Sequence, residues 1–273
     1  MTLPTDSAPI LQAKDYAAAS VFQPENLLRE ARRQKHLAPG SIPAVCLLDP
    51  DGDLVRALRG SGYATLSPHW ACYHTELWLF ACGAEQVGVV GCAVGASFAV
   101  LVAEQLFASG CRLLISVTSA GQIGEGGPTP YFVLIDRALR DEGTSYHYLP
   151  PSDFSPAPAA LLDPVFAALR ATDLPIQRGT TWTTDAPFRE TAAAIEAARA
   201  HGVLAVEMEA ASLYAFAAAR DRDVLCFAHV TNQMAQVEGD FEKGEASGTR
   251  DMLRLVEATA KAWRSIRRIC QGT

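Results

Sequence analysis

Residues 206–214 read Val-Glu-Met-Glu-Ala-Ala-Ser-Leu-Tyr, and this stretch decides how the rest of the chain is interpreted. A short apolar run leads into it, and the alanine-rich residues 210–220 predict a helix. Glu207 and Glu209 therefore flank Met208 at the start of a helix. In one interpretation, the dipole of the helix N-terminus favours these acidic residues. In the other, a carboxylate accepts hydrogen bonds from both hydroxyls of a vicinal diol while the methionine packs on a sugar face.

Outward from this stretch, apolar runs alternate with amphipathic segments along the whole chain. The runs predict strands over 44–48, 75–82, 86–92, 111–117, 131–136, 175–182, 203–206 and 224–230. The amphipathic segments predict helices over 25–37, 97–109, 161–171, 189–200, 210–220 and 252–270. This alternation predicts an α/β fold, with a single three-layer α/β/α domain over residues 21–273 and a central mixed β-sheet. Residues 1–20 are weakly patterned and predict an N-terminal arm.

Loops that follow the expected strands are the first place to look for a site, because ligands in such folds bind at the carboxyl ends of strands. Three of these loops carry polar side chains. They follow Leu48, Val117 and Val230. We therefore expect these loops to carry part of the chemistry.

The composition excludes several classes of function. Apolar residues make up 49% of the 273 residues, enough for a sizeable core. The chain has 23 Lys and Arg against 30 Asp and Glu, a formal net charge of −7, which argues against a nucleic-acid partner. No signal peptide and no apolar run of the ~18–20 residues that cross a bilayer are found, so no membrane partner is expected. The seven cysteines lack metal-site spacing and predict buried free thiols in a cytoplasmic protein without a metal.

The stretch 202–217, GVLAVEMEAASLYAFA, resembles the signature of the nucleoside phosphorylase family, which includes uridine phosphorylase, hexameric purine nucleoside phosphorylase and nucleosidases. Residues 46–56, 102–123, 139–150 and 179–190 resemble further blocks of that family in the same order. The resemblance implies a phosphorylase-like fold and a pentosyltransferase that cleaves the N-glycosidic bond of a nucleoside. It further implies phosphate as a possible co-substrate, no other cofactor, and a homo-oligomer that is a dimer or a trimer of dimers.

The resemblance also assigns residues to the sugar. Glu209 falls on the glutamate that holds the ribose 2′- and 3′-hydroxyls, Met208 lies against the sugar, and Glu207 pairs with an outer group or with the substrate. Cleavage passes through an oxocarbenium-like ribose, so a negative charge coupled to the 2′-hydroxyl binds more strongly as positive charge develops. Both glutamates are therefore candidate catalytic residues.

The base site is expected around Asn232, which stands where purine-specific relatives carry an aspartate that protonates the leaving base. An amide can hydrogen-bond a base edge but cannot act as a general acid, which favours a pyrimidine or another activated base. Thr184, Asp185 and Phe188 lie in the block that lines the base in relatives. The alternatives are that Asp185 caps a loop and that Phe188 is a core aromatic residue.

The anion site departs from the family pattern. Gly52, Ser116 and the region of Tyr73 stand where relatives carry phosphate-binding arginines. Ser119 remains, with Thr118 and Gly121 in a loop whose N–H groups could bind an anion, and Arg56 is the arginine that could restore a charge. We therefore expect weak phosphate binding, which leaves two alternatives open: a nucleoside hydrolase that uses water, and a non-catalytic nucleoside-binding protein.

Overall fold

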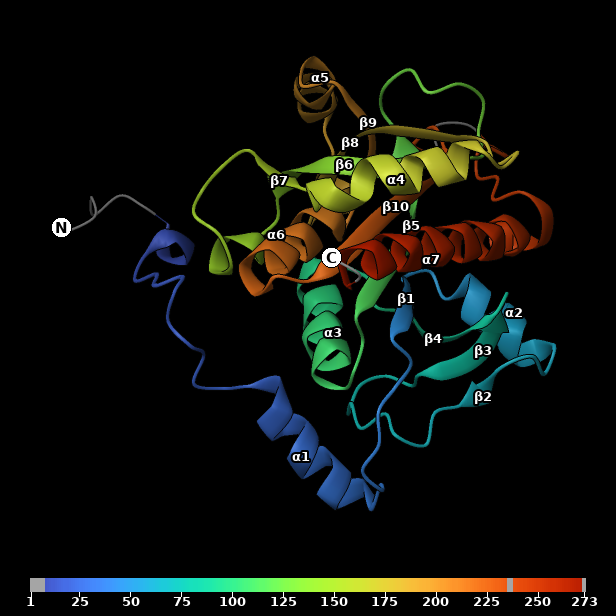
Figure 1. Cartoon of the computed structure of the whole chain (residues 1–273). Coiled ribbons are helices and arrows are strands. Elements are labelled where there is room, and N and C mark those ends of the chain that lie inside the picture. The colour runs from blue at the N-terminus through green and yellow to red at the C-terminus, as the bar shows by residue number, and fades with distance from the viewer. Residues whose placement is uncertain (1–7, 235–237, 272–273) are drawn as a thin grey trace.

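The strands of the protein form one mixed sheet with helices on both sides (Figure 1). The structure is a computed structural model and describes residues 8–234 and 238–271. Within these ranges the sheet has ten strands. They are β1 Val45–Asp49, β2 Thr65–Leu66, β3 Trp78–Cys82, β4 Glu85–Gly91, β5 Leu113–Gln122, β6 Tyr131–Asp141, β7 Phe154–Pro156, β8 Ile176–Thr184, β9 Val203–Glu207 and β10 Asp223–Asn232.

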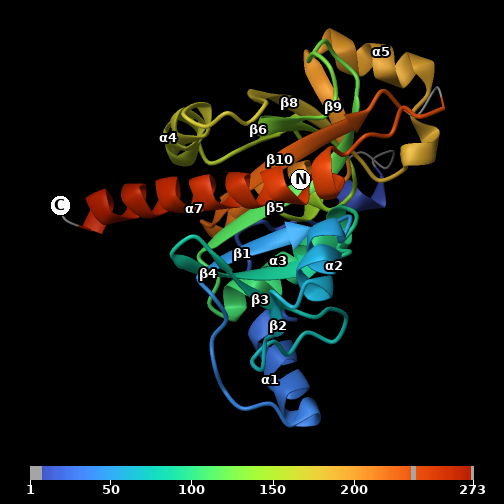
Figure 2. The same cartoon turned by 90° about the vertical axis from the view of Figure 1, so that its right-hand side faces the viewer.

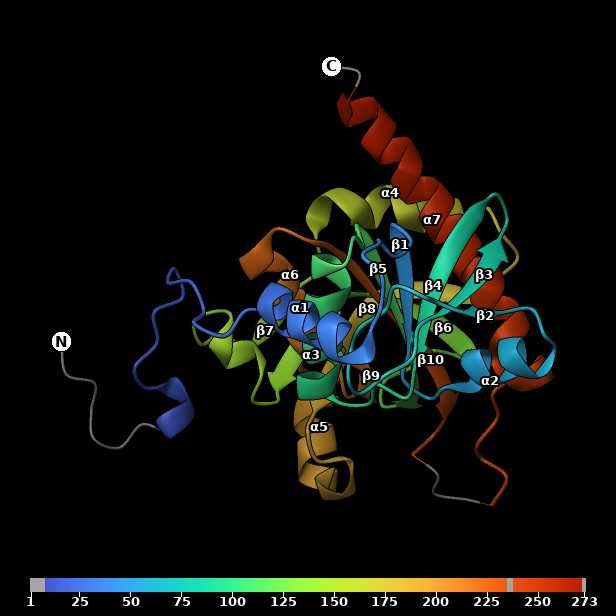
Figure 3. The same ribbon diagram turned by 90° about the horizontal axis from the view of Figure 1, so that it is seen from below.

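The helices form two layers around this sheet. The α-helices are α1 Pro24–Lys35, α2 Asp53–Gly60, α3 Ala96–Ala108, α4 Ala159–Arg170, α5 Ala192–Ala200, α6 Ala210–Arg220 and α7 Thr249–Gln271. Short 3-10 helices are η1 Pro9–Leu11, η2 Ser145–His147, η3 Pro187–Arg189 and η4 Glu245–Gly248. Helices α1, α3 and α6 pack together on one side, and α4 and α7 on the other (Figure 3). The expected α/β fold with a central mixed sheet is confirmed.

Part of the sheet closes on itself. Strand β10 pairs in parallel with β5 and antiparallel with β6, and the path β6–β8–β9–β5 completes a ring. Strands β1, β4, β3 and β2 extend the sheet from β5, and Figure 2 shows them on the other side of α7 from β6, β8 and β9. All five residues of β1 are buried, because β1 pairs with a parallel strand on each side and is covered by helices. The closure was not expected from the sequence.

Strand β5 is longer than the sequence indicates. The expected loop after Val117 is wrong, because Thr118 and Ser119 continue the pairing of β5 with Ala228 and His229 of β10. Gly121 then turns the strand onto β9. The candidate anion residues therefore lie on a strand, where sheet hydrogen bonds fix their backbone. The expected loop after Val230 is also shorter, because β10 runs on to Asn232 across a bulge.

Helix α2 was not expected either. It begins at Asp53, directly after Gly52, whose φ of +74° turns the chain out of β1 and into the helix. A left-handed φ favours glycine, because any other side chain clashes with its own backbone there. The helix starts so soon after β1 that Asp49, Asp51 and Asp53 are held close to its N-terminus.

The described part of the N-terminal arm, residues 8–20, lies over η2. Lys14 Nζ hydrogen-bonds to His147 Nδ1 at 2.7 Å, and Tyr16 donates to the carbonyl of Tyr146. The division into an arm and one domain stays a prediction. Among the described residues, no helix is long and apolar enough to cross a membrane.

The cysteines are free, as expected, wherever the structure describes them. Five of these six are buried, but Cys92 is exposed, so the expectation of buried thiols is wrong for this residue. Cys92 directly follows the end of β4 with a φ of 62°, and its Sγ lies beside the position that a side-chain carbon on Gly52 would take. Cys270 lies outside the residues whose side chains are described.

Candidate active site

Glu207 ends β9 and is held entirely by the protein. Its carboxylate accepts hydrogen bonds from the hydroxyls of Thr181 and Thr183, at 3.1 and 2.5 Å, and from the N–H groups of Glu209 and Ala210, both at 2.7 Å. Four donors occupy the usual acceptor positions of a carboxylate. Glu207 therefore fixes the start of α6 to β8, and its catalytic role stays a prediction.

Glu209 is the N-cap residue of α6 and is 1% exposed. Its Oε1 accepts a hydrogen bond of 2.7 Å from the N–H of Gly95, the N-cap residue of α3, so two helix N-termini meet at this carboxyl. The N–H of Met208 donates to Oε2 at 3.3 Å, and Thr118 also lies close enough to stabilise the charged form. Burial, assisted by the charge of Glu207, nevertheless raises the pKa of Glu209 to about 8.

Asp51 occupies the position at which the sequence predicted an anion site. Its Oδ2 accepts a hydrogen bond of 3.1 Å from the N–H of Ser119 and a second, short one from the Ser119 hydroxyl. A backbone N–H and a hydroxyl that converge on one oxygen are a typical anion-binding arrangement. In this protein the anion that they bind is one of its own carboxylates.

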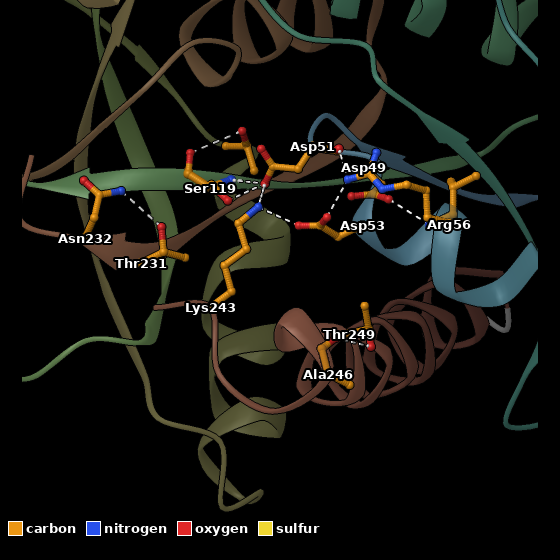
Figure 4. Close-up of polar contacts among 12 residues, drawn as sticks. Asp49, Asp51, Asp53, Arg56, Ser119, Thr231, Asn232, Lys243, Ala246 and Thr249 are labelled. Carbon is orange, nitrogen blue, oxygen red and sulfur yellow. Dashed lines mark hydrogen bonds and ion pairs between the residues drawn. The ribbon is translucent and has the colours of Figure 1, made fainter. Parts of the chain in front are cut away.

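Lys243 completes the surroundings of Asp51 (Figure 4). It lies between β10 and α7, and its Nζ is 3.4 Å from Asp51 Oδ2 and 2.5 Å from Asp53 Oδ2. Burial alone would lower the pKa of Lys243, but pairing with Asp53 and Asp51 outweighs it and raises the pKa. We name the three donors around Asp51 Oδ2, which are the Ser119 N–H, the Ser119 hydroxyl and the Lys243 ammonium, the acceptor subsite.

Arg56 lies next to this subsite, on α2. Its guanidinium pairs with Asp53 at 2.5 Å and donates to the carbonyl of Asp51 at 2.9 Å. Its side chain is 61% exposed, so it neutralises the loop from the solvent side. The other two positions at which the resemblance implies arginines in relatives bring no charge. Ser116 is buried with its hydroxyl unpartnered, and Tyr73 donates to Gln34.

Asn232, at the end of β10, is brought next to the strand that carries Ser119, because it pairs with Gly121 of β5. Its amide is engaged locally: Nδ2 donates to Thr231 Oγ1 at 3.1 Å, and Oδ1 accepts from the N–H of Met234 at 2.9 Å. Gly121 leaves room for Met234, whose Sδ lies 2.6 Å from where a side-chain carbon would stand. The role of Asn232 toward a base stays a prediction.

The remaining base candidates are not assembled into one surface. Thr184 is buried and its hydroxyl accepts from the N–H of Ala186. Asp185 is exposed and accepts from the N–H of Gly143 at 2.9 Å, which is the loop-capping arrangement. Phe188 is fully exposed, so its alternative interpretation as a core aromatic residue is wrong.

The comparison with protein families decides the identity of the fold. Residues 45–261, well over half of the chain, match the family model described as the phosphorylase superfamily. The chain belongs to the phosphorylase superfamily. The resemblance noted in the sequence is thereby confirmed.

Individual phosphorylases support this family. A DeoD-type purine nucleoside phosphorylase of Brevibacillus brevis is 28% identical over 173 residues, which cover 63% of this chain and 74% of that protein. The corresponding protein of Bacillus cytotoxicus is 31% identical over 136 residues, which cover 49% of this chain and 58% of that protein. The crystal structure of uridine phosphorylase from Vibrio fischeri matches with a TM-score of 0.65 and 19% identity, over 80% of this chain and 92% of that chain.

In this phosphorylase-superfamily chain, sequence reasoning missed Asp51 and Lys243. Asp51 was seen only as part of the loop after Leu48, and Lys243 belongs to no recognised block. Gly95 had a weak signal, because it ends a glycine-containing segment that begins at Gly91. Among the described residues, no three His, Cys, Asp or Glu side chains are placed to hold a metal ion.

Proposed function

We propose that this protein cleaves the N-glycosidic bond of a nucleoside and transfers the ribosyl group to water, which makes it a nucleoside hydrolase on a phosphorylase fold. The observation that supports this proposal best is the carboxylate of Asp51 on Ser119. Phosphate carries between one and two negative charges at neutral pH, and it would have to bind where a carboxylate already lies. Water meets no such repulsion.

The sugar is held at Glu209 and Met208 in this proposal. As the C1′–N bond breaks, the base leaves with the bonding electrons and positive charge develops on the ribose. The carboxyl of Glu209, hydrogen-bonded to the ribose hydroxyls, stabilises that charge in a buried, low-dielectric setting. Water forms the new bond to C1′, and its proton is returned to the departing base nitrogen, so that water adds across the broken bond.

Phosphorolysis is the second candidate, and two observations favour it. The guanidinium of Arg56 lies beside Gly52, so a cation is present near the position that carries arginine in relatives. Phosphate could then bind if the residue 49–53 loop released Ser119. The similarity to purine nucleoside phosphorylases of Brevibacillus brevis and Bacillus cytotoxicus supports this candidate too.

Product analysis distinguishes these functions. The protein is incubated with pyrimidine and purine nucleosides, without phosphate and then with increasing phosphate, and the sugar product is identified. Free ribose formed at a phosphate-independent rate is the expected result. Ribose 1-phosphate formed with a saturable phosphate requirement would establish the phosphorylase instead. Nucleoside binding without any product would establish a non-catalytic binding protein. The expected homo-oligomer is tested alongside by measuring the mass in solution.

A further inference from the structure

All three donors of the acceptor subsite are in place, and they bind a carboxylate of the protein itself. Three donors from β5 and from the connection before α7 converge on one oxygen, which belongs to Asp51. A tetrahedral oxyanion presents an oxygen of the same kind, and charge-assisted hydrogen bonds of this type are the strong ones. The Asp51 side chain is 30% exposed, so its removal would leave an opening to solvent.

The charges around Asp51 also favour the binding of an inorganic anion once the Asp51 carboxylate is removed. Lys243 pairs with Asp51 and Asp53, and Arg56 pairs with Asp53, whereas Asp49 is fully buried and forms none of these ion pairs. His229 lies near enough for its pKa to be lowered, first by burial and then by the charge of Lys243. Without Asp51, the carboxylate of Asp53 would pair with two cations. A bound phosphate monoanion would then restore the negative charge that Asp51 supplies.

We propose that Asp51 determines the acceptor of this protein, because its carboxylate takes the place of an inorganic oxyanion on the Ser119 and Lys243 donors and so excludes phosphate. The activity part of this inference rests on the proposed function, whereas the binding part does not. Removal of the Asp51 carboxylate exposes a latent phosphate site. In that variant an oxygen of the phosphate monoanion forms the bond to C1′, the C1′–N bond breaks with its electron pair leaving on the base, and the base takes up a proton that the phosphate gives up.

The first experiment measures phosphate binding without nucleoside, by calorimetry, on the full chain. Asp51→Gly vacates the subsite, and Asp51→Asn removes the charge while keeping the size. Asp53→Asn is the matched control, because Asp53 also pairs with Lys243 but does not contact Ser119 among its described bonds. We expect Asp51→Gly to bind phosphate roughly tenfold or more tightly than the wild type. Asp51→Asn should show a smaller gain and Asp53→Asn none.

Two results would overturn the inference. One is tight, saturable phosphate binding by the wild type, which needs no variant to detect. The other is an equal gain in Asp53→Asn, which would indicate a general charge effect. In Asp51→Gly,Ser119→Ala the gained affinity should be lost again. Where the wild type hydrolyses nucleosides, the sugar product of Asp51→Gly should shift from ribose to ribose 1-phosphate. Phosphate binding without this shift, in a wild type that does hydrolyse nucleosides, would overturn the role of Asp51 in determining the acceptor.

Discussion

The guanidinium of Arg56 reaches back over Gly52, so that its Nη1 lies 2.8 Å from the position that a side-chain carbon on Gly52 would take. Cys92 Sγ borders the same position at 2.6 Å. Gly52 therefore meets two requirements at once: its left-handed φ turns β1 into α2, and its missing side chain makes room for a cation. Arg56, the fourth residue of α2, thus lies beside the position at which the resemblance implies an arginine in relatives.

Gly52→Ala should destabilise the protein and also displace its neighbours. Gly62→Ala is the matched control, because Gly62 has a similar φ of +72° but nothing near its side-chain position. Both variants should lose about 1–2 kcal/mol of unfolding free energy in urea, the cost of a left-handed alanine. Only Gly52→Ala should push the Cys92 thiol outward and speed its reaction with a thiol reagent. Equal labelling rates would contradict the close packing at Gly52.

Glu209→Gln should keep the fold and lower kcat/KM by about 10²-fold or more, because a charged contact to the transition state is lost. Steady-state kinetics with the preferred nucleoside check this, and circular dichroism checks the fold. Glu196→Gln is the control, because the Glu196 side chain is 75% exposed on α5 and pairs only with Arg199 among its described ion pairs. Turnover close to that of the wild type in Glu209→Gln would remove the assignment.

The pH dependence of kcat/KM should reflect the ionisation of the Glu209 carboxyl. Burial and the charge of Glu207 raise the pKa of Glu209 to about 8, so the charged form that accepts two ribose hydroxyls becomes more abundant as pH rises. We expect kcat/KM to increase from about pH 7 and to level off above about pH 9. This increase of kcat/KM with pH should be absent from Glu209→Gln. A flat wild-type profile over this range would argue against a titrating ribose ligand.

Asp49 should make the stability of the protein depend on pH. It is 0% exposed with Oδ1 unpartnered, and burial raises its pKa from 3.8 to about 6. The folded state thus binds the proton more tightly than the unfolded chain, so stability falls as pH rises through this window. Between a pH below 3.8 and a pH above about 6, the unfolding free energy of Asp49→Asn should rise by about 3 kcal/mol relative to that of the wild type. Denaturant unfolding of both proteins at each pH measures this difference.

Asp53→Asn provides a control of opposite sign for that measurement. Burial alone would raise the pKa of Asp53, but hydrogen bonds from Lys243 and Arg56 outweigh it and lower the pKa. Asp53 therefore contributes stability above its unfolded pKa, and this contribution is lost as pH falls. Asp53→Asn should lose stability relative to the wild type as pH rises. If both variants shift in the same direction, the burial argument for Asp49 is wrong.

Asn232→Asp should widen the range of bases. The wild type lacks a general acid at this position and should prefer pyrimidine or otherwise activated nucleosides. An aspartate can still accept the Met234 N–H and can be protonated to serve a purine. We expect the ratio of kcat/KM for inosine to that for uridine to rise by about tenfold or more. A wild type already strongly selective for inosine or guanosine would contradict this expectation.

The alternation of apolar and amphipathic segments was sufficient to predict the fold class, but the end of β5 was not predictable in this way. Thr118, Ser119 and Gly121 are polar or small, which is typical of a loop. They form a strand because β10 and β9 supply hydrogen-bonding partners from distant parts of the chain. Local patterns contain no information about such partners.

The candidate site was predictable only in part, for a related reason. Glu209 and Ser119 lie in motifs that a sequence displays directly. The contact of Ser119 with Asp51 joins residues 68 positions apart, and that of Lys243 with Asp53 joins residues 190 apart. Only the folded topology brings these groups together, so the charge that fills the anion position could not be read from any one segment.

The residues that form the acceptor subsite and fill it come partly from a strand and partly from surface connections, and this has an evolutionary consequence. Ser119 belongs to the sheet, but Asp51 and Lys243 lie on connections, one before α2 and the other before α7. Connections tolerate substitution and changes of length better than buried strands do. A lineage with this fold can therefore exchange one acceptor for another by altering two short surface segments while inheriting its core unchanged. The carboxyl of Glu209, which we propose binds the ribose, is fixed where two helices begin, so it has no such freedom and should diverge more slowly.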